Sequence, residues 1–232
     1  GETGSYFGSL TDGKPTPPTG HAAVLALYFH MVPPERMAAT IAFARNQFPA
    51  EDPFPYTYKF FLDVLYRMDT PAFDASVLEI IRDKWQPMTR YETGTVSEDF
   101  DGGSYLHNVG AAPAYFLSAY VLGVRTTPQP DGLRLVVEPH LGDLRQARGR
   151  VVTEYGIVPV AWDRTGNGLR FRMVIPQGVN ATVKIPRISD QPSLTLNGET
   201  LLAGGRTGWR AEIRDSYVVL TLTPGEYAGS IR

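Results

Sequence analysis

The sequence contains no cysteine among its 232 residues, which excludes disulfide bonds, thiolate catalysis and cysteine-ligated zinc. This absence fits both cytosolic and extracytoplasmic proteins, so the compartment stays open. Net charge is also nearly absent, because 22 Lys and Arg residues stand against 24 Asp and Glu residues. A basic nucleic-acid-binding surface and an acidic disordered tail are therefore not expected.

Long hydrophobic runs are missing too. The apolar stretch 22–29 is too short to cross a bilayer, and the stretch 109–122 is interrupted by Pro113 and Ser118. What is present is the composition of an ordinary globular protein, with 43% hydrophobic and 20% charged residues. The four histidines form no metal-ligand pattern, so neither a metal site nor a cofactor is predicted, and no membrane partner is expected.

The first half of the chain has the three- and four-residue spacing of apolar side chains that is typical of helices. Residues 19–31 are apolar on nearly every face, which indicates a helix buried on more than one side. Four further helices are expected at about 34–48, 56–68, 71–85 and 111–122, the last ending at Gly123. Alternation of heavily apolar and one-sided helices predicts stacked helical hairpins, in which outer helices shield inner ones.

The second half changes to the two-residue period of strands. Alternation is clear in 133–139 and 169–175, it continues through 209–213 and 217–222, and Asn197-Gly198 is a strong two-residue hairpin signal. About eight short strands separated by turns predict an antiparallel β-sandwich, with Trp162 and Trp209 in its core.

The change of period sets the predicted domain boundaries. Residues 1–124 form the helical part, 125–132 form a linker, and 133–232 form the sandwich, because the segment RTTPQPDG between them is rich in proline and turn residues. The predicted fold class is therefore α+β and multidomain.

One Gly-rich loop before the last helix gathers polar and aromatic side chains. Glu98, Asp99, Asp101 and His107 lie among Tyr91, Phe100 and Tyr105. Glycosidases use paired carboxyl groups, and flat rings beside carboxylates suit a sugar site. The same residues also suit a loop whose rings fill the end of a helical bundle. The residues alone favour this second interpretation, because most acidic side chains are simply solvated.

Three parts of the chain resemble bacterial α-L-rhamnosidases of glycoside hydrolase family 78. The segment DKWQPMTRYETGTVSEDF resembles the family's Trp-x-x-Met, Gly and Thr-x-Trp-Glu run, and SYLHNVGAAPAYFLSAYVLGVR resembles its Ser-His-Ala-Trp loop and following helix. LRLVVEPHLGDL, GRVVTEYGIVPVAW and LRFRMVIPQGVNATVKIP resemble its C-terminal sandwich. The likeness covers about residues 16–228 and implies the late part of an (α/α)₆ toroid followed by a β-sandwich.

The resemblance also implies a reaction, the inverting hydrolysis of terminal α-L-rhamnosides. The family's motif glutamate, its general base, falls on Glu98, and the histidine of the Ser-His loop falls on His107. His107, Tyr91 and Tyr105 would then line the rhamnose pocket. An inverting base stands back from the sugar and leaves room for a water molecule.

The sequence departs from the family pattern in three places. Ser97 occupies the position of the tryptophan before the glutamate, and Asn108-Val109 replaces Ala-Trp after the histidine. The family's general acid lies in an earlier acidic segment that this chain does not contain, and about five helices are expected where a closed toroid has twelve. The chain is therefore expected to be one part of the enzyme, associating with the missing part of the catalytic domain or with itself.

Two rival functions stay open at this stage. A non-catalytic carbohydrate-binding or scaffold fragment is favoured by Ser97 and by the missing acid. A polysaccharide lyase using Tyr and His fits the residue types but not the order of the loops. Ultraviolet absorption by the product distinguishes a lyase, because only a lyase creates a new double bond.

Overall fold

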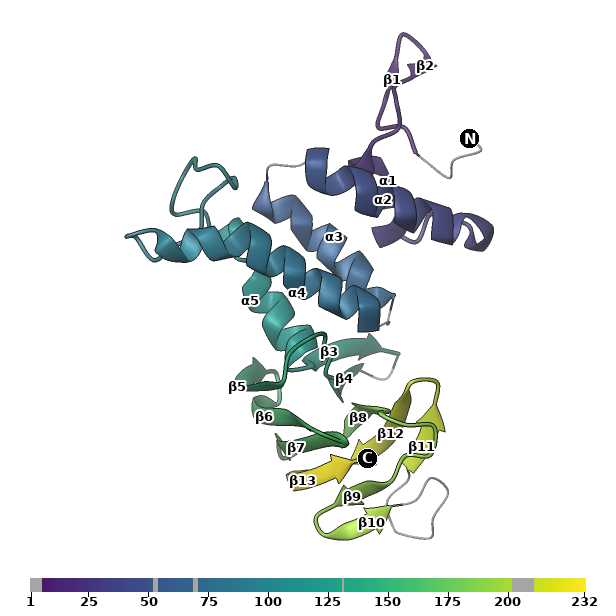
Figure 1. The fold of residues 1–232 in the computed structure, drawn as a ribbon, viewed down its shortest axis with the longest axis vertical. Coiled ribbons are helices and arrows are strands. Elements are labelled where there is room, and N and C mark those ends of the chain that lie inside the picture. Colours follow the sequence, from purple (N-terminus) through teal and green to yellow (C-terminus); the bar gives the residue numbers. More distant parts are fainter. Residues whose placement is uncertain (1–5, 52–53, 69–70, 131, 202–210) are drawn as a thin grey trace. The chain divides into compact units, whose positions relative to one another are not determined.

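The computed structural model describes residues 6–51, 54–68, 71–130, 132–201 and 211–232. The chain divides into two compact units, a mainly helical unit at Gly1–Pro113 and a mainly stranded unit at Ala114–Arg232 (Figure 1). The predicted α+β class is thereby confirmed. Among the described residues, no helix has both the length and the hydropathy needed to cross a membrane.

The helical unit contains the expected helices with shifted ends. Its helices are α1 (Gly20–Tyr28), α2 (Met37–Glu51), α3 (Pro55–Arg67) and α4 (Pro71–Trp85), with 3₁₀ turns η1 (Pro34–Arg36), η2 (Gln86–Arg90) and η3 (Asn108–Gly110). The Thr19 hydroxyl accepts a bond from the Ala22 amide and caps α1. The helix ends three residues before the expected position 31, because His30 adopts a left-handed φ of 56° that no helix continues.

Aromatic rings form the centre of the helical unit. The Phe48 ring on α2 lies 5.1 Å from the Tyr58 ring and 4.9 Å from the Phe61 ring, both on α3. All three side chains are buried, as are Ala44 on α2 and Val77 on α4. The apolar stripes predicted for these helices therefore face the core, and α1 packs on both α2 and α3.

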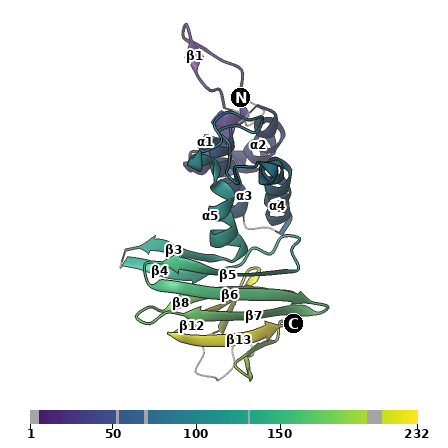
Figure 2. The ribbon, with the colours of Figure 1, turned by 90° about the vertical axis from the view of Figure 1, so that its left-hand side faces the viewer.

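Two short strands precede the helices, and no strand was expected there. β1 (Leu10–Thr11) and β2 (Lys14–Pro15) form a two-stranded antiparallel ribbon that projects from the helices (Figures 1 and 2). Asp12 and Gly13 both have positive φ values, 51° and 73°, as a two-residue hairpin turn requires. The expectation that strands begin only after the helical part is therefore wrong.

The last helix is not a uniform α-helix. It begins as α5 (Ala112–Phe116) and continues as the π-helical turn η4 (Leu117–Val121), in which the Leu122 amide donates to the Leu117 carbonyl at 2.9 Å. Gly123 ends it with φ 82°, as predicted. A Cβ atom there would lie 2.4 Å from the Glu138 backbone, so glycine is also required because these two segments of the backbone approach closely.

The second unit is a two-layer β-sandwich. One sheet has the order β10-β9-β13-β7-β6-β5, and the other has the order β11-β12-β8-β4-β3 (Figure 2). The strands are β3 (Val124–Gln129), β4 (Gly132–Val137), β5 (Gln146–Thr153), β6 (Gly156–Thr165), β7 (Gly168–Ile175), β8 (Ala181–Pro186), β9 (Leu194–Leu196), β10 (Glu199–Leu201), β11 (Ala211–Arg214), β12 (Tyr217–Leu222) and β13 (Gly225–Ile231). Alternate residues of β6, β7 and β8 are buried, which places the core between the sheets.

Two sequence-based expectations for this unit need correction. The predicted linker 125–132 contains most of β3, and Asp131 lies outside the described residues. Pro128 was misleading because β3 is an edge strand, where a proline costs no ladder hydrogen bond. The sandwich is also not wholly antiparallel, since β4 pairs with β8 in parallel, with Leu135 opposite Ala181.

Two other features of the sandwich agree with the predictions made from the sequence. Asn197 and Gly198 have φ values of 48° and 86° and connect β9 to β10, so the predicted hairpin is confirmed. Trp162 is 2% exposed, and its indole N–H donates to the Val121 carbonyl at 2.9 Å. The other tryptophan predicted in this core, Trp209, lies outside the described residues.

Candidate functional site

The loop between Gly94 and His107 folds back on itself and is held by backbone hydrogen bonds. The His107 amide donates to the Val96 carbonyl at 3.3 Å, and the Glu98 amide donates to the Ser104 carbonyl at 2.9 Å. Asp99 and Gly102 exchange two bonds of 3.4 Å at the tip. These bonds give the Gly-rich segment a defined path although it contains no regular strand.

Phe100 and Trp85 attach this loop to the helical core. The Phe100 ring lies edge-on at 5.0 Å from Trp85 and 5.1 Å from Tyr58. The Trp85 indole donates a 2.7 Å hydrogen bond to the Gly110 carbonyl, and a Cβ atom at Gly110 would lie 2.7 Å from the Ser97 carbonyl. Phe100 therefore packs at the end of the helical core. This is the arrangement expected if the rings of the loop fill the end of a helical bundle.

Glu98 behaves differently from Phe100, because its side chain is exposed. Only the backbone of Glu98 is fixed, through its bond to Ser104. Gly103 lies directly beside it with φ 75°, and a Cβ atom there would be 3.3 Å from the Glu98 Cβ and 3.0 Å from an Asp99 carboxylate oxygen. Glycine at position 103 thus avoids a tight contact with the Asp99 carboxylate and with the Cβ atom of Glu98.

Tyr91 and Tyr105 are brought together by the folding of the loop. Their rings lie edge to face at 5.0 Å, the Tyr91 hydroxyl is 3.5 Å from the Ser97 hydroxyl, and the Thr95 hydroxyl donates to the Tyr105 carbonyl. Tyr91 is half-buried, whereas Tyr105 is 46% exposed. The pair therefore offers one accessible ring beside polar groups, which is a feature of sugar sites.

His107 has an unusual polar environment. The residue is half-buried, yet its Nδ1 atom is fully buried and has no hydrogen-bond partner among the described residues. Most buried polar atoms have a partner, so this nitrogen has the capacity for one further hydrogen bond, to water or to a ligand. Of the four sequence-predicted site residues, the structure brings Tyr91 and Tyr105 into contact and places Glu98 and His107 in the same folded loop.

Ser97 is the residue that the resemblance aligns with a tryptophan. It is fully buried, and its hydroxyl donates to the Asp99 carbonyl at 2.7 Å. Asp101 contributes its amide to the Asp99 carboxylate at 3.1 Å, which makes a local turn. No group of three or more His, Asp or Glu side chains in the described ranges is placed to hold a metal ion.

A buried electrostatic cluster lies in the sandwich, and the sequence analysis did not predict it. Glu138, after the end of β4, is 3% exposed and pairs with Arg125 and, at 2.6 Å, with Lys184. Burial by itself raises the pKa of Glu138, but Arg125, Lys184 and His140 together outweigh it and lower that pKa. An acid directly following a buried apolar run was the available signal. The cluster lies in the sandwich and joins β3, β4 and β8.

Comparisons with known proteins identify the stranded part of the chain. Residues 123–195 match the model of the bacterial alpha-L-rhamnosidase C-terminal domain. A search among curated proteins finds no match. Two solved structures are similar to nearly the whole chain, an alpha-L-rhamnosidase from Dictyoglumus thermophilum and a Streptomyces avermitilis alpha-L-rhamnosidase complexed with L-rhamnose.

The first similarity has a TM-score of 0.75 at 19% identity and covers 98% of this chain and 26% of the other. The second has a TM-score of 0.59 at 17% identity and covers 96% and 22%. At these identities the likeness concerns the fold, and the chain spans about a quarter of the length of either protein. The predicted resemblance is thus confirmed: the chain is similar to the C-terminal portion of bacterial α-L-rhamnosidases, and residues 123–195 match that family's C-terminal domain.

Proposed function

We propose that this chain is the C-terminal portion of an enzyme that hydrolyses terminal α-L-rhamnosides with inversion. The match of residues 123–195 to the rhamnosidase C-terminal domain carries this proposal. The fixed loop of residues 94–107 supports it, because the loop carries the exposed carboxylate of Glu98 and the accessible ring of Tyr105.

Glu98 is the general base of the proposed reaction. Its exposed carboxylate takes a proton from a water molecule while that water attacks the anomeric carbon, and the rhamnoside leaving oxygen is protonated by a second carboxyl group. In inverting glycosidases the two carboxyl groups stand about 6.5–9.5 Å apart, with the water between them. The acid belongs to an earlier segment of the enzyme, so these 232 residues alone do not complete the reaction.

His107, Tyr91 and Tyr105 bind the sugar in this proposal. The buried Nδ1 of His107 has no described partner and suits a hydrogen bond to a sugar hydroxyl, directly or through a water molecule. Tyr105 offers a ring face, and Tyr91 supports that ring at 5.0 Å.

The helical unit is proposed to be the late part of an (α/α)₆ toroid. Apolar side chains on and after α1 support a missing neighbour, because Leu25, Phe29 and Met31 are 41%, 61% and 67% exposed. The rest of the catalytic domain would cover these side chains. That remaining part of the catalytic domain would also supply the general acid.

The test is Glu98→Gln in the complete enzyme, assayed on an aryl α-L-rhamnoside. The amide keeps the shape of the side chain but cannot accept the proton, so turnover should fall by about two to four orders of magnitude. L-rhamnose binding should persist. Asp101→Asn is the matched control, because Asp101 is an exposed acid of the same loop and should leave turnover within about threefold.

Full turnover by the Glu98→Gln enzyme would refute the assignment and make Glu92 the next residue to test. Strong activity from the 232-residue chain alone would contradict the missing acid. Inversion is checked separately, because the first rhamnose released should be the β-anomer, as proton NMR of the early product can show.

A non-catalytic fragment is the second candidate function. The observation in its favour is Ser97, whose buried hydroxyl is committed to the Asp99 carbonyl and offers no ring to a sugar. Under this alternative L-rhamnose binds, but the Glu98→Gln and wild-type proteins show equal, background turnover in the complete protein.

A further inference from the structure

The outward face of the six-stranded sheet is hollowed and carries a concentration of arginines. Two adjoining hollows of about 600 and 770 Å³ lie on it, and both are lined by Arg148, Ala161, Arg172 and Ala228. These four residues form one cross-strand row, because Arg148 pairs with Ala161, Ala161 with Arg172, and Arg172 with Ala228. The face belongs entirely to the sandwich unit.

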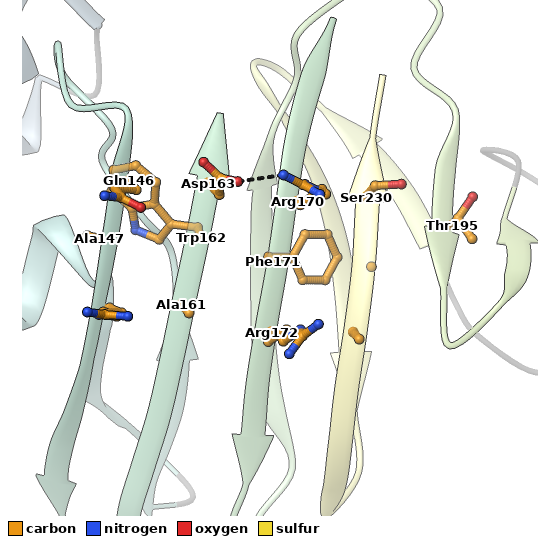
Figure 3. Close-up of a pocket in the computed structure, with 13 residues that line it drawn as sticks. Gln146, Ala147, Ala161, Trp162, Asp163, Arg170, Phe171, Arg172, Thr195 and Ser230 are labelled. Carbon is orange, nitrogen blue, oxygen red and sulfur yellow. Dashed lines mark hydrogen bonds and ion pairs between the residues drawn. The ribbon is translucent and has the colours of Figure 1, made fainter. Parts of the chain in front are cut away.

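Short side chains in the middle of the row create the hollow. Ala161 separates Arg148 from Arg172, and adjacent strands lie about 4.8 Å apart, so the two arginine backbones are about 10 Å apart. Ala228 continues the low floor on β13, and Ser230 and Thr195 lie in the next row (Figure 3). A flat ligand about one ring wide fits between two guanidinium groups on such a floor.

Only some of the arginines on this face form ion pairs with acidic side chains. Arg170 pairs with Asp163 across the strands at 2.8 Å (Figure 3). In the part of the chain that the structure describes, the guanidinium groups of Arg148, Arg150 and Arg172 make no hydrogen bond or ion pair. All three are exposed, on a chain whose net charge is −2. Asp163 and Glu226 are the acids that line the hollows, so the four arginines Arg148, Arg150, Arg170 and Arg172 still leave this face locally positive.

The chemistry of the lining selects among anionic ligands. The aromatic residues that line the hollows, Trp162, Phe171 and Tyr227, are only 2%, 4% and 6% exposed, because they point into the core. Stacking of nucleic-acid bases or of neutral sugar rings needs accessible aromatic faces. Guanidinium groups recognise carboxylates with paired, parallel hydrogen bonds, which the lining does offer.

We propose that this outward face binds an acidic oligosaccharide, with Arg148 and Arg172 each engaging a carboxylate and Ala161 and Ala228 forming the floor. The choice of a saccharide as the carrier of the carboxylates rests on the proposed glycosidase function, whereas the charge preference rests on the arginines. The site is separate from the loop of Glu98, and it would hold an acidic glycan on the enzyme without taking part in hydrolysis.

The test titrates the 232-residue chain with oligogalacturonate by calorimetry at low salt. The fully methyl-esterified oligomer has the same backbone without the charges, and single-stranded DNA is a polyanion of a different class. We expect binding to oligogalacturonate, weakening with added salt, and at least about tenfold weaker binding to the ester and to DNA. No binding to oligogalacturonate, equal binding to the ester, or tighter binding to DNA would overturn the proposal.

Variants locate the site. Arg148→Gln/Arg172→Gln should reduce the affinity by about tenfold or more, since each change removes charged hydrogen bonds. Lys14→Gln/Arg214→Gln removes the same charge from exposed positions elsewhere and should leave affinity within about twofold. An equal loss in both variants would contradict the site, and circular dichroism verifies that each variant is folded.

The outcome is independent of the test of Glu98. Oligogalacturonate binding by the chain needs no turnover, and Glu98→Gln should leave it unchanged. Binding without rhamnosidase activity would refute the proposed function alone, and activity without binding would refute this inference alone.

Discussion

The sandwich unit and the helical unit differ in whether selected buried polar groups find hydrogen-bond partners within the chain. In the sandwich, the buried carboxylate of Glu138 is held by Arg125 and Lys184, and the buried indole of Trp162 donates to Val121. In the helical unit, the buried Nδ1 of His107 has no described hydrogen-bond partner, and Phe29 is 61% exposed. The difference is one of degree, because Arg187 in the sandwich also keeps a buried Nε without a described partner, although its other two nitrogens donate to the Asp215 and Asp190 carbonyls.

This difference fits the comparisons. The family model covers residues 123–195, which lie within the sandwich unit. A self-contained sandwich can be recognised by itself. Under the proposal that the helical unit belongs to a larger catalytic domain, we expect its surface, rather than its core, to respond to the rest of that domain.

The largest expected effect concerns the polar core of the sandwich. Glu138→Ala leaves Arg125 and Lys184 facing a site without a counter-charge, so the free energy of unfolding should fall by about 3–5 kcal/mol. Urea unfolding followed by tryptophan fluorescence measures it. Glu212→Ala removes an exposed partner of Arg214 and should cost less than about 1 kcal/mol. Similar losses in the two variants would remove the contrast between the buried cluster and the surface.

The pH dependence of the sandwich is the next effect. The folded pKa of Glu138 lies below its ordinary value of 4.5, so the unfolded chain binds the proton more readily. The stabilisation is therefore complete above about pH 4.5 and is lost as the pH falls toward the folded pKa. Glu138→Gln should have a flatter stability profile between pH 5 and 3, measured by urea midpoints. An unchanged slope would show that other carboxyl groups control acid unfolding.

In the helical unit, the anchor of the candidate loop should be weaker than the Glu138 cluster. Trp85→Phe keeps the ring packing against Phe100 but removes the 2.7 Å hydrogen bond to the Gly110 carbonyl. We expect a loss of about 1–2 kcal/mol in stability. In the complete enzyme, rhamnoside turnover should also fall, because Gly110 packs against the Ser97 carbonyl beside Glu98. Turnover that tracks only the folded fraction would contradict a positioning role.

The smallest expected change in stability tests the open surface. Phe29→Ser/Met31→Ser changes exposed side chains and should alter the unfolding free energy of the chain by less than about 0.5 kcal/mol. It should nevertheless reduce self-association at micromolar concentration, measured by light scattering. Val152→Ser/Ile157→Ser is the matched control, because these residues are 81% and 54% exposed on the sandwich. A wild-type chain that is a stable monomer would contradict the missing-neighbour interpretation.

The sequence by itself determined the type and order of the elements. Helical spacing placed α2, α3 and α4, and period-two alternation placed β7 and β12, because local burial patterns repeat at the period of the backbone. Asn197-Gly198 predicted its hairpin because both positions need positive φ. The resemblance selected Glu98 and His107, and the residue types alone could not distinguish them from an ordinary polar loop.

The tertiary structure decided what depends on residues far apart in the chain. β3 appeared where the prolines of 125–132 suggested a linker, because an edge strand tolerates Pro128. The parallel pairing of β4 with β8 and the meeting of Arg125, Glu138 and Lys184 depend on strand order, which no local pattern encodes. The row of Arg148, Ala161, Arg172 and Ala228 also exists only across four strands. Side chains from separate segments form a site only when the sheet fixes their register.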